Sequence, residues 1–475
     1  MPVDTPHNSF KKHESQWKEV RDAMAGEEAV KNEGVRYLPK LSGQNTEDYQ
    51  AYKTRAMFYG ATGRTHNGLM GAMFRKDPTY ALPNRISGLE ESTDNGGTPL
   101  NMFAQLVAAE VLGVGRLGLL TDLPEASGET PYLVVYQAEQ ITNWRVRVIN
   151  DKPTLEQVIL FEVSEEPAED GFGSKIVERF RVLDLVALGQ SVRLVYRVQI
   201  YEKTDDKSDE WEMTEEKFPT RRGENLDFIP FTFIGPHGLK PAIAKAPLYD
   251  LAVVNMSHYR TSADLEHGCH WTALPTPWVS GLREETTTLH IGSQTAWTLP
   301  AGAQAGMLEF SGAGLSALEK RLIEKQQLMA RLGARLLEDQ KRAAETAESK
   351  RLDYSGDNSV LSSVANSVSE GMRRNLNWAN LWAGGNEDEV EFEANRDFFD
   401  DQLEPAEMVQ LVATWQSGGL PKEALFWNLK QGERLPPDMT FEEYERQLEE
   451  EGPPLGGTDN SEPDDTDEDE DEEET

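Results

Sequence analysis

The sequence predicts an α+β fold in which helices form the first and last thirds and antiparallel strands form the middle. Apolar residues recur at helical spacing in several long stretches outside the middle third. Between residues 131 and 240, short runs alternate apolar and polar side chains and are separated by turn-forming residues. These runs follow one another without intervening helices, so the pattern favours an antiparallel meander over a parallel βαβ series.

The first 130 residues are expected to be mainly helical. Ser15 to Ala25 has the spacing of a short amphipathic helix, and residues 48–74 have the spacing of one longer helix. Asp77-Pro78 should end that longer helix, because a proline disfavours helical geometry at the residue before it. Thr98 is placed to cap a further helix that runs from Pro99 to Leu112.

The middle third reads as a series of short strands with turn signals between them, for example at Asn150-Asp151. The predicted strands are 132–136, 144–148, 155–163, 176–185, 193–200 and 228–234.

Helical patterns return after residue 247. Pro247 introduces a helix that reaches about Gly268, and the Gly- and Pro-rich stretch after it contains short strands around Trp278 and Trp297. A Ser- and Asn-rich turn is expected near residues 356–359. Further helices are predicted at 315–351 and 360–382 and, in shorter pieces, around 408–415, 422–429 and 441–448.

The chain is strongly acidic, with a formal net charge of −36. The tail from Asp459 to Thr475 holds twelve acidic residues and no Lys or Arg, so the rest of the chain carries −36 + 12 = −24. This balance argues against general binding to duplex nucleic acid, which depends on counterion release by cationic side chains. It is compatible with a channel through which DNA slides without sticking. The tail should be disordered and either keeps the protein soluble or contacts a basic partner.

The residue usage also narrows the setting in which the protein works. A single cysteine, Cys269, excludes an intrachain disulfide framework and fits a reducing cytoplasm. Residues 1–12 lack the apolar core of a signal peptide, and the most apolar run, residues 106–120, is too short to cross a bilayer. We therefore expect no membrane association.

The segment from Leu315 to Arg351 is the most informative part of the chain. Its nine Lys and Arg residues against six acidic residues give a local charge of +3 within an acidic protein. Its apolar residues follow a near-heptad register that Lys325 interrupts. They are Leu315, Leu318, Leu322, Met329, Leu332 and Leu336. The sequence thus predicts a helix with one face for a partner helix and another face of cations.

Both faces of this helix leave two interpretations open. The cations, among which we single out Arg331, Arg335, Lys341 and Arg342, either pair with acidic neighbours across a subunit interface or face DNA. The Leu/Met seam is either core within one chain or a coiled contact between subunits.

No motif supports catalysis, so we expect no enzymatic activity. Gly113, Gly115 and Gly118 match the spacing of a dinucleotide-binding loop, but a helix precedes them and a strand follows, which favours a helix-to-strand corner. A phosphate-binding GxxxxGK[ST] loop is absent from the sequence. The cluster of His258, His267, Cys269 and His270 has no CxxC pair to support it, so neither a metal nor another cofactor is predicted.

Three stretches, taken together and in order, resemble tailed-bacteriophage portal proteins, in the branch formerly described only as a domain of unknown function. The first contains Tyr37-Leu38-Pro39, Tyr49, Tyr52, Arg55-Ala56, Phe58-Tyr59, Arg64-Thr65, Gly68, Gly71 and Phe74. The second contains Ile229-Pro230-Phe231, Pro247-Leu248, Leu251-Ala252, Asn255, His258-Tyr259-Arg260, Ala263-Asp264 and Pro275-Thr276-Pro277-Trp278. The third contains Gly312-Ala313-Gly314-Leu315, Met329, Leu332-Gly333-Ala334, Glu345-Thr346-Ala347, Leu361 and Ala365.

The resemblance implies a portal-like fold with wing, stem, clip and crown regions around an axial channel. Mapped onto this chain, it implies an N-terminal helical wing region at 1–130, an antiparallel β wing and clip region at 131–240 and a stem helix at 245–272. It further implies a Gly/Pro-rich β segment at 273–314, long helices near the channel at 315–385 and a helical crown region at 386–451. The acidic disordered tail at 452–475 follows and belongs to no motif of the family.

The resemblance also implies a function. Portal proteins form a ring, typically of twelve copies, at one vertex of the capsid, through which double-stranded DNA is packaged and later ejected. The implied partners are further copies of the chain, the terminase large subunit, the major capsid and scaffolding proteins, and the head-completion or tail proteins. The implied location is the virion, and the host cytoplasm during assembly. The alternative is another structural protein of the virion, such as a head-completion or tail component.

Overall fold

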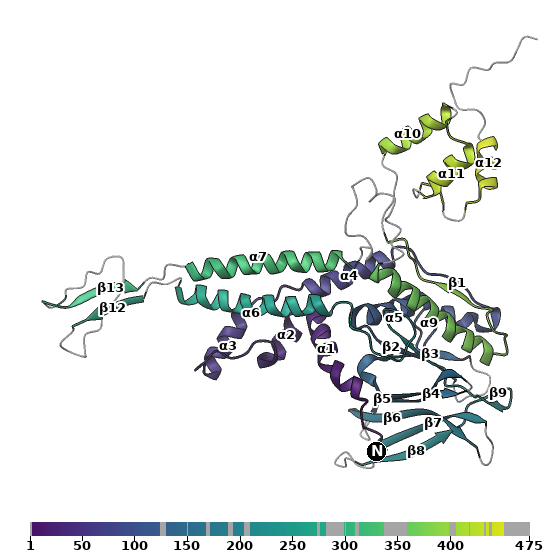
Figure 1. Cartoon of the computed structure of the whole chain (residues 1–475), viewed down its shortest axis with the longest axis horizontal. Coiled ribbons are helices and arrows are strands. Elements are labelled where there is room, and N and C mark those ends of the chain that lie inside the picture. The colour runs from purple at the N-terminus through teal and green to yellow at the C-terminus, as the bar shows by residue number, and fades with distance from the viewer. Residues whose placement is uncertain are drawn as a thin grey trace, which may run out of the picture. The chain divides into compact units, whose positions relative to one another are not determined.

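The computed structural model describes residues 2–123, 130–149, 151–167, 172–188, 193–203, 210–272, 276–281, 299, 301–308, 313–336, 359–398, 405–417, 419–431, 434–436 and 439–450. The chain divides into two compact units, Met1–Phe398 and Phe399–Thr475. The fold is α+β, as the sequence predicts, with helices and antiparallel sheets in the larger unit (Figure 1).

Helices dominate the N-terminal part of the larger unit. They are α1 (Asn8–Ala25), α2 (Glu27–Asn32), η1 (Gly34–Arg36), α3 (Thr46–Arg55), α4 (Ala61–Met73), η2 (Asn84–Glu90) and α5 (Leu100–Val114). Helix α1 begins well before the predicted Ser15, and the ring of His7 caps it by accepting the backbone N–H of Ser9. Helix α5 agrees with the prediction, but Thr98 does not cap it, because its hydroxyl instead donates to Asp94 at 2.6 Å.

The single helix predicted for residues 48–74 is wrong. Helix α3 ends at Arg55, because Ala56 leaves the helical region with φ −58° and ψ 134°. The chain resumes a helix only after Gly60, and the residues between bond to another element: the backbone N–H of Met57 donates to Ser262 Oγ at 3.3 Å. The apolar spacing that predicts one helix is therefore also compatible with two, because hydrogen bonds to a distant element satisfy the backbone at the break between them.

Strands β2 (Leu117–Asp122), β3 (Tyr132–Gln137) and β11 (Phe231–Ile234) form a buried sheet in the order β11-β2-β3. Between α5 and β2, Gly115 adopts a left-handed conformation with φ 79°, which confirms the predicted helix-to-strand corner. The predicted strand at 228–234 thus lies beside β2 and outside the meander.

The meander is confirmed as a five-stranded antiparallel sheet in sequential order. Its strands are β4 (Ile141–Ile149), β5 (Lys152–Pro167), β6 (Ser174–Ala187), β7 (Leu194–Lys203) and β8 (Trp211–Lys217). Short strands β9 (Thr220–Arg221) and β10 (Glu224–Asn225) and the turn η3 (Ala138–Gln140) flank it. A core that includes Trp17, Ile141, Leu183, Tyr196 and Phe231 joins α1, this sheet and the β11-β2-β3 sheet.

The remaining elements of the larger unit begin with α6 (Tyr249–Thr272), which lies alongside α7 (Ala313–Ala334) (Figure 1). The hairpin of β12 (Thr276–Ser280) and β13 (Gln304–Leu308) connects their ends. Helix α9 (Val360–Trp382) has the predicted bounds, and β14 (Glu391–Glu393) pairs with β1 (Thr79–Ala81). The predicted continuation of the α7 helix through 337–351, the turn at 356–358 and the strand at Trp297 lie outside the described residues.

The smaller unit contains α10 (Pro405–Gln416), α11 (Lys422–Gln431) and α12 (Phe441–Glu450), close to the three helices predicted there. Phe426 of α11 packs against Phe441 and Tyr444 of α12, with ring centroids 5.5 and 5.2 Å apart. Residues 386–398, which the sequence groups with these helices, belong to the larger unit instead. None of the described helices is long and apolar enough to span a membrane, and the acidic tail lies outside the described residues.

Candidate functional site

The candidate site is the α6–α7 helix pair, because α7 carries the cationic residues that the sequence singles out. Helix α6 is held on one side by α3 and α4. The fully buried side chain of Asn255 accepts the backbone N–H of Thr62 at 3.1 Å and donates to the carbonyl of Tyr59 at 2.9 Å. Since Gly60 offers α4 no capping side chain, Asn255 supplies the cap from another helix.

A second tie joins α3 to α6. The hydroxyl of Tyr52 on α3 donates to Asp264 Oδ1 on α6 at 2.6 Å. Burial, and then this hydrogen bond, raise the pKa of the Tyr52 phenol above its usual value. Helix α6 is therefore anchored to the N-terminal helices at two points along its length.

Helix α7 packs on another side of α6. Lys325 Nζ donates to the carbonyl oxygen of Ser257 at 2.9 Å and to Thr261 Oγ1 at 2.5 Å. Near the other end, Leu315 approaches Gly268 so closely that a Cβ there would lie 2.6 Å from the leucine methyl carbon. Burial, and then repulsion by Arg321 and Arg260, lower the pKa of the Lys325 ammonium.

Lys325 is the residue whose role the sequence does not reveal. It interrupts the predicted apolar register of α7, and the structure shows that the interruption is a cross-link to the backbone of α6. A lysine at a core position of a heptad pattern is the one signal that points to such a contact.

The apolar seam of α7 lies within one chain over the described residues. Met329 and Leu336 are buried, and the seam leucines nearer the N-terminus of the helix are half-buried. Of the two interpretations that the sequence leaves open, this part of the seam fits core within one chain, since it packs on α6. Away from this seam, Ile323 is 54% and Leu328 44% exposed.

Arg331 is exposed in the last turn of α7, and Arg335 is exposed in the turn that directly continues it, where its backbone N–H donates to the Arg331 carbonyl at 3.1 Å. Neither guanidinium reaches a carboxylate of the described residues, whereas Arg321 on the same helix pairs with Glu324 at 3.1 Å. The other two predicted residues, Lys341 and Arg342, lie outside the described residues. The structure thus brings two of the four predicted cations together, and the described residues offer neither of them a carboxylate.

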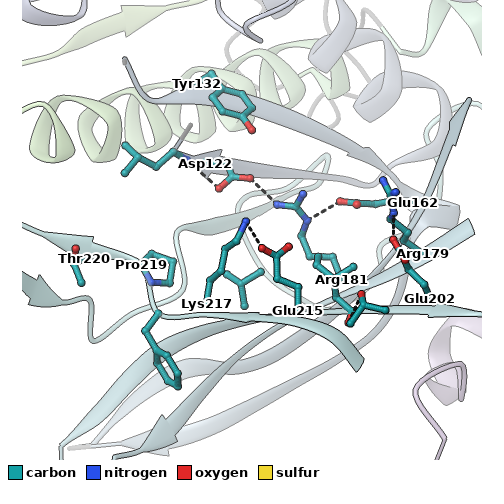
Figure 2. Close-up of a pocket in the computed structure, with 15 residues that line it drawn as sticks. Asp122, Tyr132, Glu162, Arg179, Arg181, Glu202, Glu215, Lys217, Pro219 and Thr220 are labelled. Carbon is teal, nitrogen blue, oxygen red and sulfur yellow. Dashed lines mark hydrogen bonds and ion pairs between the residues drawn. The ribbon is translucent and has the colours of Figure 1, made fainter. Parts of the chain in front are cut away.

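A second charged region, which the sequence analysis missed, lies between the two sheets (Figure 2). A pocket of about 570 Å³ is lined there by Asp122, Glu162 and Arg181 among others. Arg181 lies 2.6 Å from Asp122 and 2.8 Å from Glu162. Burial alone lowers the pKa of Arg181, but Tyr136, Glu162 and Asp122 together raise it above its usual value. Because Arg181 pairs with carboxylates on both neighbours, this network fastens β6 to β2 and β5. Its charged groups bind one another and leave Arg181 engaged.

The His/Cys cluster separates into unrelated contacts. His258 lies beside Gln326, His267 accepts the indole N–H of Trp271 at 3.0 Å, and His270 lies 3.1 Å from Arg55. Among the described residues, no group of three or more His, Cys, Asp or Glu side chains is arranged to hold a metal ion.

Comparisons with known proteins add a family match and a set of similar structures. A family model described as "Domain of unknown function (DUF4055)" matches residues 247–383, which run from the start of α6 to the end of α9. This range includes most of the second and third stretches of the portal resemblance and excludes the first. The comparison with curated proteins finds no match.

Among solved structures, three similar chains come from gene transfer agent (GTA) particles. The first is described as "Neck of empty GTA particle computed with C6 symmetry", with 14% identity, a TM-score of 0.37, and coverage of 76% of this chain and 86% of that one. The second, "Virion of native gene transfer agent (GTA) particle", has 14% identity, a TM-score of 0.37, and coverage of 86% and 99%. The third, "Neck of native GTA particle computed with C12 symmetry", has 14% identity, a TM-score of 0.37, and coverage of 83% and 95%.

Proposed function

We propose that this chain is a structural subunit of a phage-type particle, and specifically a portal that assembles into a ring at one capsid vertex. The observation that carries the proposal is the two-sided construction of α7. One side of the helix is fastened to α6 through Lys325, and the other side presents Arg331 and Arg335 without carboxylate partners among the described residues.

The charge balance explains why such a helix suits a ring. In a chain with a net charge of −36, an exposed pair of arginines gains most from carboxylates that a neighbouring copy brings close. Phosphates of passing DNA are the other available anions. Because the ring is acidic overall, its contact with DNA would be weak, and a contact with phosphates would not depend on the DNA sequence. In a ring with closed symmetry each copy presents the same helix face, so either contact, with carboxylates of the next copy or with DNA phosphates, would repeat around the ring.

The rest of the proposal rests on the ordered sequence resemblance. It assigns the α6–α7 pair to the stem and channel region, the meander to the wing or clip, and the C-terminal helices to the crown. It also assigns the functional partners: the terminase motor during packaging, the capsid and scaffolding proteins during assembly, and the head-completion or tail proteins afterwards. The proposed role is non-enzymatic, and DNA passes through the ring in both directions.

Electron microscopy of the purified full chain tests the proposal directly. We expect holed rings of uniform copy number, with mass photometry giving a single multiple of the 53.2 kDa chain. Only monomers or compact dimers under all salt and concentration conditions would refute the ring. Particles that carry many copies over the shell, instead of one ring at a vertex, would favour the alternative of another virion structural protein.

A further inference from the structure

His258 occupies an unusual position in the α6–α7 contact. Its side chain lies on α6 where α7 covers it, and the residue is only 5% exposed. One ring nitrogen, Nε2, lies 3.3 Å from the amide nitrogen of Gln326 on α7. The other, Nδ1, is buried and has no hydrogen-bond partner among the described residues. The ring also packs against Tyr59, with centroids 5.4 Å apart. Because the Gln326 amide nitrogen is a donor, Nε2 accepts from it and the neutral ring carries its proton on Nδ1. A second proton, on Nε2, would face that donor.

Cations and a carboxylate lie on the elements around His258. From α7, Lys325 reaches over the same turn of α6 and bonds to Ser257 and Thr261, the neighbours of His258 in that turn. From α4, the guanidinium of Arg64 lies 4.4 Å from the ring of Tyr59, which separates it from His258. On α6 itself, the nearby carboxylate of Asp264 is engaged by the hydroxyl of Tyr52. Burial, and then the charge of Lys325, lower the pKa of the His258 imidazole.

We propose that the α6–α7 contact is a proton-sensitive joint, in which protonation of His258 releases α7 from α6. A protonated ring would place a buried cation beside the partly buried Lys325 and would turn Nε2 into a donor that faces the donating amide nitrogen of Gln326. When α7 moves away from α6, water reaches both cations, which screens their repulsion and accepts the imidazolium N–H groups. The inference goes beyond the proposed ring, because it concerns two helices of one chain and holds for any oligomeric state.

The sign of the pH dependence follows from linkage. In the packed state the pKa of His258 lies below its ordinary value of 6.5, and in the lifted state it returns towards that value. The lifted state therefore binds more protons, and packing of α7 is strongest above 6.5 and weakens as the pH falls below it. The lifted population should grow by at most about tenfold for each pH unit down to the packed-state pKa.

Hydrogen exchange of the full chain at about pH 8 and about pH 5, corrected for intrinsic exchange rates, measures this population. We expect amides of residues 313–336 to lose protection at the lower pH, by up to roughly tenfold for each pH unit below the ordinary histidine pKa, while the core of the β11-β2-β3 sheet does not. His258→Gln, which keeps a neutral polar side chain, should abolish the loss. Lys325→Met should reduce it, because the remaining imidazole titrates closer to its ordinary pKa.

His267→Gln provides the matched control. His267 lies on the same helix and its pKa is also lowered, but it is only partly buried and bonds to Trp271 rather than to α7. This variant should keep the full pH-dependent loss of protection. Two results would overturn the proposal: unchanged protection of α7 in the wild type across this pH range, or the same loss in His258→Gln as in the wild type. Because the wild-type comparison stands alone, a variant that fails to fold does not remove the test.

Discussion

The side chain of Asn255 on α6 caps α4 by accepting the backbone N–H of Thr62 at 3.1 Å, across 193 residues of sequence. The same amide donates to the carbonyl of Tyr59, so one buried side chain satisfies both the start of α4 and the chain that leads into it. The same tertiary hydrogen bonds therefore fix both the bend between α3 and α4 and the position of α6 beside them.

Asn255→Ala should lower the free energy of unfolding by about 1–3 kcal/mol, because it leaves the buried N–H and hydroxyl of Thr62 without their acceptor. Urea denaturation followed by circular dichroism measures the loss. Asn255→Asp keeps the acceptor for Thr62 but loses the donor to Tyr59, so it separates the two bonds. If Asn255→Ala is as stable as the wild type, the capping role is wrong.

Replacing Arg331 and Arg335 together by Gln distinguishes the two roles proposed for the exposed face of α7. Rings that still form but package or retain less DNA would indicate that the guanidiniums face DNA. Rings that fail to form would indicate an interface with carboxylates of the next copy. Arg321→Gln is the matched control, because its guanidinium is already paired with Glu324, and it should leave rings and DNA content unchanged. Wild-type behaviour of the double variant in both assays would remove α7 from either role.

Arg116 is a buried cation that pairs with no carboxylate among the described residues. Its guanidinium carbon lies 4.2 Å from the Trp144 ring and 4.7 Å from the Phe233 ring, and the guanidinium donates to the carbonyl of Pro241 at 2.8 Å. Arg116→Met should change the free energy of unfolding by less than about 1.5 kcal/mol, since it keeps the volume and removes a desolvated charge. Arg116→Ala should cost about 2–5 kcal/mol because it leaves a cavity. Equal losses for the two variants would show that the cation itself stabilises the core.

The difference in stability between the wild type and Arg116→Met should change with pH in a defined direction. Burial lowers the pKa of Arg116 to about 9, so above that pH the unfolded chain binds more protons at this position than the native chain. The native wild type should therefore gain stability relative to Arg116→Met as the pH rises above 9. Chemical denaturation of both proteins at several alkaline pH values gives the difference, in which other titrating groups cancel. A constant difference would contradict the lowered pKa.

In the charge network between the sheets, a mutation of a partly buried charge should cost more stability than a mutation of an exposed charge at the rim. Arg181 is held by both Asp122 and Glu162, and Glu162 also accepts the hydroxyl of Tyr136 at 2.6 Å. Glu162→Gln weakens one side of this partly buried network but leaves Arg181 paired with Asp122, so it should cost about 1–3 kcal/mol through weaker hydrogen bonds to Arg181 and Tyr136. Lys217→Gln, which changes a more exposed charge on the rim of the same pocket, should cost less than about 1 kcal/mol. Thermal unfolding of the two variants side by side tests the ranking.

Much of the fold could be read from local patterns. The bounds of α9, the order of the meander strands and the corner at Gly115 were predictable because each depends on residue spacing or on one glycine with positive φ. The register that marks α7 as two-sided was equally visible, and so was the acidity of the chain. These properties follow from covalent spacing and composition alone.

The candidate site depended more on tertiary structure. The sequence located Arg331 and Arg335, but only the packing of α7 on α6 decided that both lie on the side away from the contact. The sequence also showed that Lys325 interrupts the apolar register. Only the packing of the helices revealed that Lys325 donates a hydrogen bond to the Ser257 carbonyl of α6. Helical periodicity could not reveal the break before Gly60, because the bonds that support it come from Asn255 and Ser262 on a distant helix. Spacing along the chain sets which elements form, whereas hydrogen bonds and buried charges between distant residues exist only once the elements pack.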